Sequence, residues 1–315
     1  FDVQSQQYSL FANGEWQATE KLTLEAGLRY ESLTYDYQNN MVDGSTRDDG
    51  NLCNSITGSC RYFRPSDRSD TSDDVNYQIG AHYDFTASTG AFFRLASAYR
   101  APQINELYRL QKEQEIADVK PEQVDSIEAG LRYQTAKWFA ELSLYRMDKD
   151  QVIVKDSDSF VVNDGETQHH GIEWQLRHQL SNNWQLTTTG SWAVHKYSYT
   201  RLFGNINIDG NDIDTAPRWQ GSAHALYQPT ETTSIELEWV YLGKYFLDPQ
   251  NAHQYAGHNM FNIRAQQHYG NWQVATQLTN LTDRRIADRA DYGFGSYRYF
   301  VGEGRGVSLE LKRLF

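Results

Sequence analysis

The sequence lacks any long apolar run, and basic residues are few. No stretch approaches the roughly 18 apolar residues that a membrane-spanning helix needs. Helical spans are therefore excluded, whereas β-strands remain possible because each crosses a bilayer in about 9–11 residues. The 29 Lys and Arg residues are outnumbered by 41 Asp and Glu, which gives a net charge of -12. Without a basic stripe to bind phosphates, we expect no nucleic-acid partner.

Motifs of common catalytic sites are also absent. The patterns GxSxG, HExxH and the P-loop do not occur, so the sequence carries none of these three catalytic motifs. The neighbours His169 and His170 should point to opposite faces of a strand and cannot chelate one metal ion. Four residues that crowd one predicted loop lack EF-hand spacing and are interpreted as a solvated turn: Asp209, Asn211, Asp212 and Asp214. We therefore expect no metal site.

The only two cysteines, Cys53 and Cys60, lie in a stretch rich in Gly, Ser and Asn, with six residues between them. A local disulfide in an oxidising compartment is favoured over a metal pair, because no histidine or second cysteine pair lies nearby. The chain begins at Phe1 without a charged or apolar leader, so any export signal is expected to lie outside this sequence.

Period-2 alternation of apolar and polar residues recurs along nearly the whole chain and predicts strands. Within Leu22–Tyr30, for example, every second residue is apolar and the intervening ones are Thr, Glu, Gly and Arg. The segments 127–134, 171–177 and 307–315 repeat this split. Several predicted strands are far longer than the about 5–6 residues of a typical globular strand: Leu22–Gln38, Trp138–Lys155 and Trp184–Thr200.

Connections between the predicted strands alternate between short and long. Short turns are expected near 19–21, 87–89, 135–137, 181–183, 229–232 and 269–271, and long segments at 39–73, 102–122, 156–165, 201–216, 249–257 and 285–297. This rhythm is typical of outer-membrane barrels, which have tight periplasmic turns and long outer loops. It predicts thirteen strands, the first at about Gln6–Gln17 and the last at about Tyr299–Phe315, both running toward the periplasm.

An antiparallel up-and-down transmembrane β-barrel therefore explains the pattern better than a soluble sandwich or propeller. Aromatic residues gather at predicted strand ends, where a lipid-interface girdle would lie: Tyr30, Tyr35, Trp138, Tyr145, Trp184 and Trp272. Thirteen strands cannot close an even-stranded barrel, and open edges in lipid leave backbone groups unsatisfied. We expect an incomplete barrel that occupies residues 1–315 as one domain, with no second domain.

Several motifs resemble the barrel of TonB-dependent outer-membrane receptors. In order they are Phe93–Pro102 (FRLASAYRAP), Asn105–Tyr108 (NELY), Lys120–Glu122 (KPE), Gly165–Glu166 leading to Gly171–Glu173 (GIE), Leu278–Arg284 (LTNLTDR) and a closing strand that ends in Phe315. Their order and spacing across about residues 90–315 resemble those of the family. The resemblance implies the last thirteen of about 22 strands, with the plug domain and the energy-coupling segment absent.

The resemblance also implies function, partners and location. A receptor of this kind lies in the bacterial outer membrane, contacts lipid and lipopolysaccharide, and imports a scarce bulky ligand with energy from the TonB complex. It does not change the ligand covalently, so the resemblance implies no enzyme activity, no catalytic residue and no cofactor. The barrel-assembly machinery would read Phe315. A ferric siderophore or similar chelate is the expected cargo, with cobalamin, haem or a sugar as alternatives. A passive porin or an outer-membrane enzyme is the alternative protein class.

The best candidates for ligand contact are Arg100, Tyr108 and Arg109, at the outer end of a predicted strand and on its loop. Arginine forks and aromatic faces suit carboxylate or catecholate ligands. The alternative is structural, with Arg100 pairing with lumen carboxylates and Tyr108 packing the loop. On predicted inward faces, carboxylates lie near arginines and are expected to form barrel–plug or cross-strand ion networks rather than a ligand site: Glu128, Glu141 and Glu173 with Arg94, Arg132 and Arg177.

Overall fold

A computed structural model describes residues 1–315 apart from 48, 54–59, 61, 112–113, 156–159 and 314–315. Thirteen strands form one sheet, and each pairs antiparallel with the next along the chain. In sheet order they are β1 (Asp2–Gln17), β2 (Leu22–Gln38), β5 (Arg68–Thr86), β6 (Thr89–Arg100), β8 (Glu122–Gln134), β9 (Trp138–Lys155), β10 (Val161–Gln179), β11 (Trp184–Tyr197), β14 (Trp219–Thr230), β15 (Thr233–Leu242), β18 (His258–Tyr269), β19 (Trp272–Thr279) and β22 (Gly306–Arg313).

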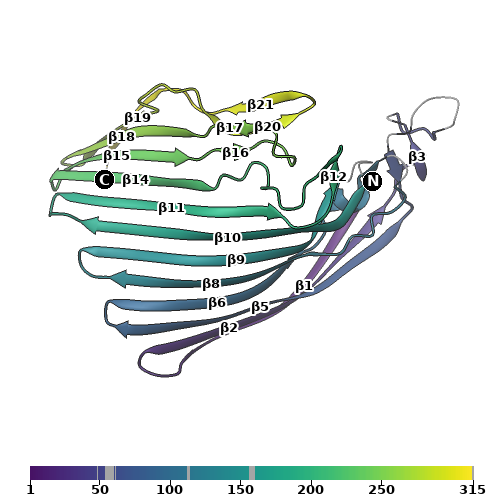
Figure 1. Ribbon diagram of the computed structural model, residues 1–315, viewed down its shortest axis with the longest axis horizontal. Helices are drawn as coiled ribbons and strands as arrows, with labels where there is room; N and C mark the ends of the chain where they lie inside the picture. Colours follow the sequence, from purple (N-terminus) through teal and green to yellow (C-terminus); the bar gives the residue numbers. More distant parts are fainter. Residues whose placement is uncertain (48, 54–59, 61, 112–113, 156–159, 314–315) are drawn as a thin grey trace.

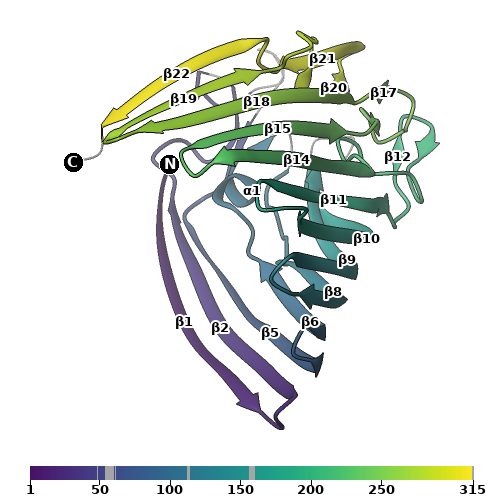
Figure 2. The ribbon, with the colours of Figure 1, turned by 90° about the vertical axis from the view of Figure 1, so that its left-hand side faces the viewer.

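The sheet curls into an open trough, and its two edge strands are β1 and β22 (Figure 2). Tight turns join the strands at one end of the trough, and the long loops gather at the other (Figure 1). The N-terminus lies at the loop end, and the last described strand, β22, ends at Arg313 opposite Trp272 at the turn end. This arrangement agrees with the predicted short and long connections, which place the loops on the outer side of a membrane.

Small elements occupy the long loops. They are the three-stranded sheet β3 (Gly44–Thr46), β4 (Tyr62–Arg64) and β7 (Leu110–Gln111), the helix α1 (Ile104–Tyr108), and the pairs β12 (Leu202–Phe203) with β13 (Ile206–Asn207), β16 (Tyr245–Phe246) with β17 (Gln254–Tyr255), and β20 (Ala287–Gly293) with β21 (Ser296–Val301). Within the described ranges, no helix has the length and apolarity required to cross a membrane.

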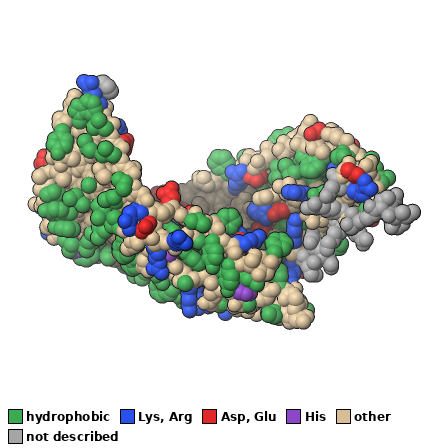
Figure 3. All heavy atoms as spheres, turned by 90° about the horizontal axis from the view of Figure 1, so that it is seen from above, with side chains coloured by type: hydrophobic (Ala, Val, Ile, Leu, Met, Phe, Trp, Pro, Cys, Tyr) green, Lys and Arg blue, Asp and Glu red, His purple; other side chains and the backbone are tan. Residues whose placement is uncertain are grey.

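The two faces of the sheet differ as the alternation predicts, because directly opposite residues of paired strands share a face. Apolar side chains cover the convex face, where Ile79 is 55% exposed and Leu309 is 72% exposed. Charged and polar side chains cover the concave face, which we call the lumen face. In Figure 3 the molecule is hollowed, with charged side chains beside the hollow and hydrophobic ones spread over a flank. A soluble sandwich, which buries its apolar face, is excluded.

Buried hydrophobic clusters lie in the loop regions rather than beneath the sheet. One contains Tyr37, Leu107 and Tyr108, and another contains Tyr245, Leu247, Ala287 and Ala290. In the loop between β3 and β4, Cys53 and Cys60 form a disulfide with an S–S distance of 2.08 Å. Phe315, the predicted assembly signal, lies outside the described residues.

The observed strand bounds agree best with the predicted ones where apolar and polar residues alternate clearly in the sequence. Strands β2 and β9 have the predicted bounds, whereas β11 ends at Tyr197. The predicted last strand was wrong at its start, because Tyr299 belongs to β21 and pairs locally with Ala290 of β20. The predicted loop 39–73 was also too long, since β5 begins at Arg68 and its first residues, which are all polar, already pair with the outer end of β2.

Candidate functional site

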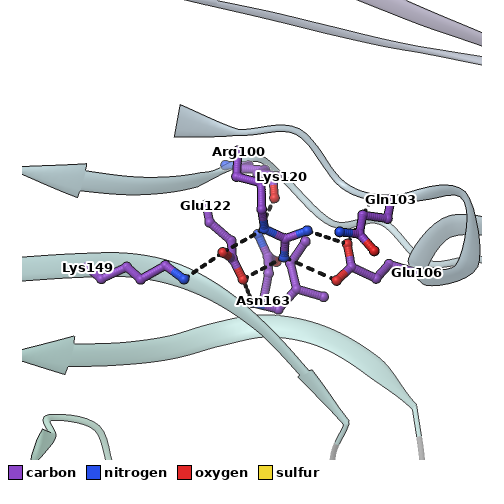
Figure 4. Close-up of polar contacts among 8 residues, drawn as sticks. Arg100, Gln103, Glu106, Lys120, Glu122, Lys149 and Asn163 are labelled. Atoms are coloured by element: carbon purple, nitrogen blue, oxygen red, sulfur yellow. Dashed lines mark hydrogen bonds and ion pairs between the residues drawn. The ribbon is translucent and has the colours of Figure 1, made fainter. Parts of the chain in front are cut away.

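A cluster of charged side chains joins three strands at the outer end of the lumen face (Figure 4). Arg100 is the last residue of β6 and lies directly opposite Glu122, the first residue of β8. Its guanidinium contacts Glu122 through Nη2 at 2.8 Å and Glu106 of α1 through Nη1 at 3.0 Å. From β9, Lys149 Nζ lies 2.7 Å from Glu122. The cluster therefore ties α1 to the barrel wall.

Glu122 is the central carboxylate of this cluster, and its side chain is only 4% exposed. Besides both cations, it accepts a hydrogen bond from the backbone N–H of Ile153 at 2.8 Å. A buried carboxylate is tolerated when its oxygens are paired in this way. Glu106 in turn accepts the backbone N–H of Gln103 at 2.7 Å and so caps α1. These contacts fix both ends of the β6–β8 loop.

Tyr108 is buried and serves the packing of α1. Its ring stacks on Tyr37 at a centroid distance of 4.5 Å, and its hydroxyl donates to Asp70 Oδ2 at 2.7 Å. Burial, followed by this hydrogen bond to a carboxylate, raises the pKa of Tyr108 well above its usual range. With 3% of its surface exposed, Tyr108 offers little area to a ligand.

Arg109, by contrast, is exposed and makes no ion pair within the part of the chain that the structure describes. The three predicted ligand residues thus differ in their surroundings. Sequence reasoning did not identify the roles of Glu106, Glu122 and Lys149. The sequence does indicate Glu122 as part of the KPE motif. Only the structure shows that this charged residue is buried at the start of a strand.

Further ion pairs line the lumen face toward the turn end. Arg132 contacts Glu141 at 2.6 Å, and Arg94 lies between Glu25 at 3.7 Å and Glu128 at 3.8 Å. The predicted network is therefore present for these arginines. Arg177 makes no ion pair with a described residue and lies over the Phe139 ring at 5.7 Å, so its predicted pairing stays a prediction.

A groove of about 710 Å³ also opens on the sheet, and the residues that line it include Glu141, Glu173, Gln220 and His258. Glu173 makes no ion pair with any described residue. The groove joins charged and neutral polar side chains from β8 to β18, so the lumen face offers hydrogen-bonding groups to whatever fills the barrel.

In the loop that was interpreted as a solvated turn, Asp212 and Asp214 make side-chain contacts within the chain. Asp212 pairs with Arg218 at 2.8 Å, and Asp214 accepts the Tyr197 hydroxyl at 2.7 Å. Over the described ranges, no three His, Cys, Asp or Glu side chains are grouped to hold a metal ion. His169 contacts His195 of β11 rather than its sequence neighbour His170.

An antiparallel sheet with one lipid-facing side and one charged side defines a bacterial outer-membrane β-barrel protein. The sequence model of the family described as "TonB dependent receptor-like, beta-barrel" matches residues 1–281. The chain therefore belongs to this family, whose members are outer-membrane transporters and not enzymes. The described residues contain no plug domain, and the sheet corresponds to part of the family's barrel.

Comparisons with individual proteins agree with this assignment. An uncharacterised TonB-dependent receptor of Haemophilus influenzae is 27% identical over 213 residues, which are 66% of this chain and 54% of that protein. The siderophore receptor PiuA of Acinetobacter baumannii superposes with a TM-score of 0.76 at 16% identity, over 98% of this chain and 43% of its own. The ferric yersiniabactin uptake receptor FyuA of Yersinia pestis gives 0.77 at 16%, over 98% and 45%. The chain thus spans about half the length of the relatives it matches.

Proposed function

We propose that the protein imports a scarce, bulky and anionic ligand, a ferric siderophore or similar chelate, across the outer membrane. In this proposal residues 1–315 act as one β-barrel domain, and the inner-membrane TonB complex supplies energy through a region outside this sequence. Two similar structures support the cargo class, since one is a siderophore receptor and the other takes up ferric yersiniabactin. Insertion by the barrel-assembly machinery and contact with lipid and lipopolysaccharide belong to the same proposal.

The observation that carries the proposal is an exposed arginine on a firmly held helix end. Glu106 and Tyr108 fix α1 against the barrel, and Arg109 follows directly with its side chain exposed. A guanidinium presents donors in a planar fork that matches carboxylate or catecholate oxygens. We propose that Arg109 and the 38% exposed side chain of Arg100 contact the ligand. Tyr108 contributes by holding them in position.

An uptake assay tests this function. Iron-starved cells that produce the full-length receptor are given a panel of radiolabelled ferric chelates, with cobalamin, haem and sugars as further cargoes. We expect saturable uptake of one ferric chelate that depends on an intact TonB complex. Uptake that persists without TonB indicates a passive porin, and chemical change of the cargo indicates an enzyme. Uptake of cobalamin, haem or a sugar alone contradicts the proposed cargo.

The arginine contacts need their own variants. Arg109→Ala should weaken chelate binding by roughly 10- to 150-fold, the equivalent of about 1.5–3 kcal/mol for hydrogen bonds to charged groups. The matched control is Arg146→Ala, because Arg146 is an exposed arginine of β9 that pairs with Asp148 on the opposite face of the sheet. Equal binding by both variants contradicts a ligand role for Arg109.

A further inference from the structure

Three side chains of metal-binding types, one methionine and two histidines, lie side by side on the lumen face of neighbouring strands. His169 of β10 is directly opposite Met147 of β9 on one side and His195 of β11 on the other. Directly opposite residues of antiparallel strands point to the same face, with Cβ atoms about 4.5–5.5 Å apart. The hairpins thus bring a thioether and two imidazoles into one row, although 48 residues separate the outer members in sequence.

The two imidazoles face each other with their nitrogens. His169 Nδ1 lies 2.8 Å from His195 Nδ1, and the ring centroids are 5.0 Å apart. At this distance the Nδ1–H of one ring donates a hydrogen bond to the unprotonated Nδ1 of the other ring. A single proton therefore lies between the two nitrogens. If a metal ion replaces this proton, the two rings need to move apart only slightly. Two nitrogens that are each about 2.0 Å from one tetrahedral ion lie roughly 3.3 Å from each other.

A further contact orients the first histidine. His169 Nε2 lies 2.9 Å from Thr167 Oγ1, and Thr167 is buried. Metal-binding histidines commonly donate their second ring N–H to an oxygen in this way, which fixes the ring and directs the other nitrogen to the ion. Thr167 thus holds His169 with Nδ1 toward His195.

The charges around the row favour a soft monovalent ion. Lys149 lies on the same face near Thr167, but its charge is offset by Glu122 at 2.7 Å. Asp212 lies beyond His195 and is paired with Arg218. No free carboxylate of the described chain therefore joins the row to bind a hard divalent ion. Thioether and imidazole ligands without carboxylate suit Cu(I).

We propose that Met147, His169 and His195 form a binding site for one soft monovalent metal ion, Cu(I). The ion takes the place of the proton that lies between the two Nδ1 atoms. This proton moves from Nδ1 to Nε2 of the same ring, so both imidazoles bind the ion in the neutral form. No redox step is involved. The site goes beyond iron-chelate uptake and does not depend on it, since all three ligands lie on the barrel wall.

The test uses the full-length receptor in detergent, with Cu(I) supplied anaerobically from its bicinchoninate complex and ascorbate as reductant. We expect the receptor to remove one equivalent of Cu(I). Met147→Leu, which conserves volume, and His169→Gln should each weaken Cu(I) binding at least about 10-fold. The matched control is His170→Gln, because His170 is on the opposite face, near Trp192. X-ray absorption of the bound copper should show one sulfur and two nitrogen neighbours.

Three outcomes would overturn the site. They are no Cu(I) taken up by the unaltered receptor, affinity unchanged in Met147→Leu and His169→Gln, or an equal loss in His170→Gln. Gel mobility before and after heating shows whether each variant is folded, and the absorption spectrum tests the ligand set without any variant. Chelate uptake is not measured in this experiment, so its result is separate from that of the cargo assay.

Discussion

Placing a charge on the convex face tests the membrane assignment most directly, and β5 offers two neighbouring positions for it. Ile79 is on the convex face, opposite Ala26 of β2 and Leu95 of β6. Phe85 lies six residues further along β5 and forms an edge contact with Tyr83, as expected for the aromatic girdle at the turn end. With a rise of about 3.3 Å per residue and a tilt of about 40°, Ile79 lies roughly 15 Å beyond Phe85. It is therefore near the middle of an apolar band about 25 Å tall.

An arginine at this depth faces hydrocarbon. Ile79→Arg should destabilise the inserted barrel by about 2–4 kcal/mol, the range for Arg or Lys at the midplane of an outer-membrane barrel. This corresponds to a roughly 30- to 1,000-fold fall in the equilibrium constant for folding, since about 1.4 kcal/mol is a factor of ten. The control is Gln78→Arg, which puts the same charge on the exposed lumen face next to Gly27.

The measurement is urea-dependent folding of the full-length receptor into lipid vesicles, followed by tryptophan fluorescence. We expect Gln78→Arg to stay within about 0.5 kcal/mol of the unaltered protein, the usual range for a surface substitution. If Ile79→Arg and Gln78→Arg shift the unfolding midpoint equally, the convex face of β5 does not meet lipid, and the face assignment is wrong.

Three further predictions concern the outer loops. Glu122→Gln removes the central charge of the cluster that holds α1 and should destabilise the loop that carries α1 by about 1–3 kcal/mol. Proteolysis of this loop should therefore be faster in Glu122→Gln than in Glu115→Gln, the control at an exposed position. Equal rates would contradict the role of Glu122. Because the pKa of Tyr108 is raised in the folded state, unfolded chains lose this proton first, near pH 10. Stability of α1 should therefore fall as pH rises above about 10, and hydrogen exchange of α1 in Tyr108→Phe should lack this dependence. Alkylation of the unreduced protein should label neither Cys53 nor Cys60, and labelling without reductant counts against their disulfide.

Strand positions were predictable wherever lipid and water act on opposite faces. Alternation predicts the parts of β2 and β9 nearer the turn end, because a lipid-facing position must be apolar and a lumen position need not be. Outside the bilayer this constraint ends. Tyr297 and Tyr299 of β21 alternate like a spanning strand, yet they belong to a hairpin in the outer loops. Alternation alone cannot separate the two cases.

The candidate site was predictable in position but not in its contacts. The sequence places Arg100 and Arg109 at the outer end of a strand, which the structure confirms for Arg100 at the end of β6. It gives no means to choose between a ligand contact and an ion pair, since Glu122 is 22 residues away. Burial of Glu122 and its contact with Lys149 decide that Arg100 is at least partly structural.

The histidines show the physical reason for this limit. The face of the sheet that His169 occupies is fixed by the alternation of side chains along β10 alone. The same alternation puts His170 on the other face, so the two histidines cannot chelate one ion. The true neighbours of His169, which are Met147 and His195, depend on how two hairpins set the register, and a shift of one residue would move either neighbour to the other face. Faces can thus be predicted from a single strand, whereas partners require the register of neighbouring strands. A site built across three strands therefore becomes visible only when all three registers are known.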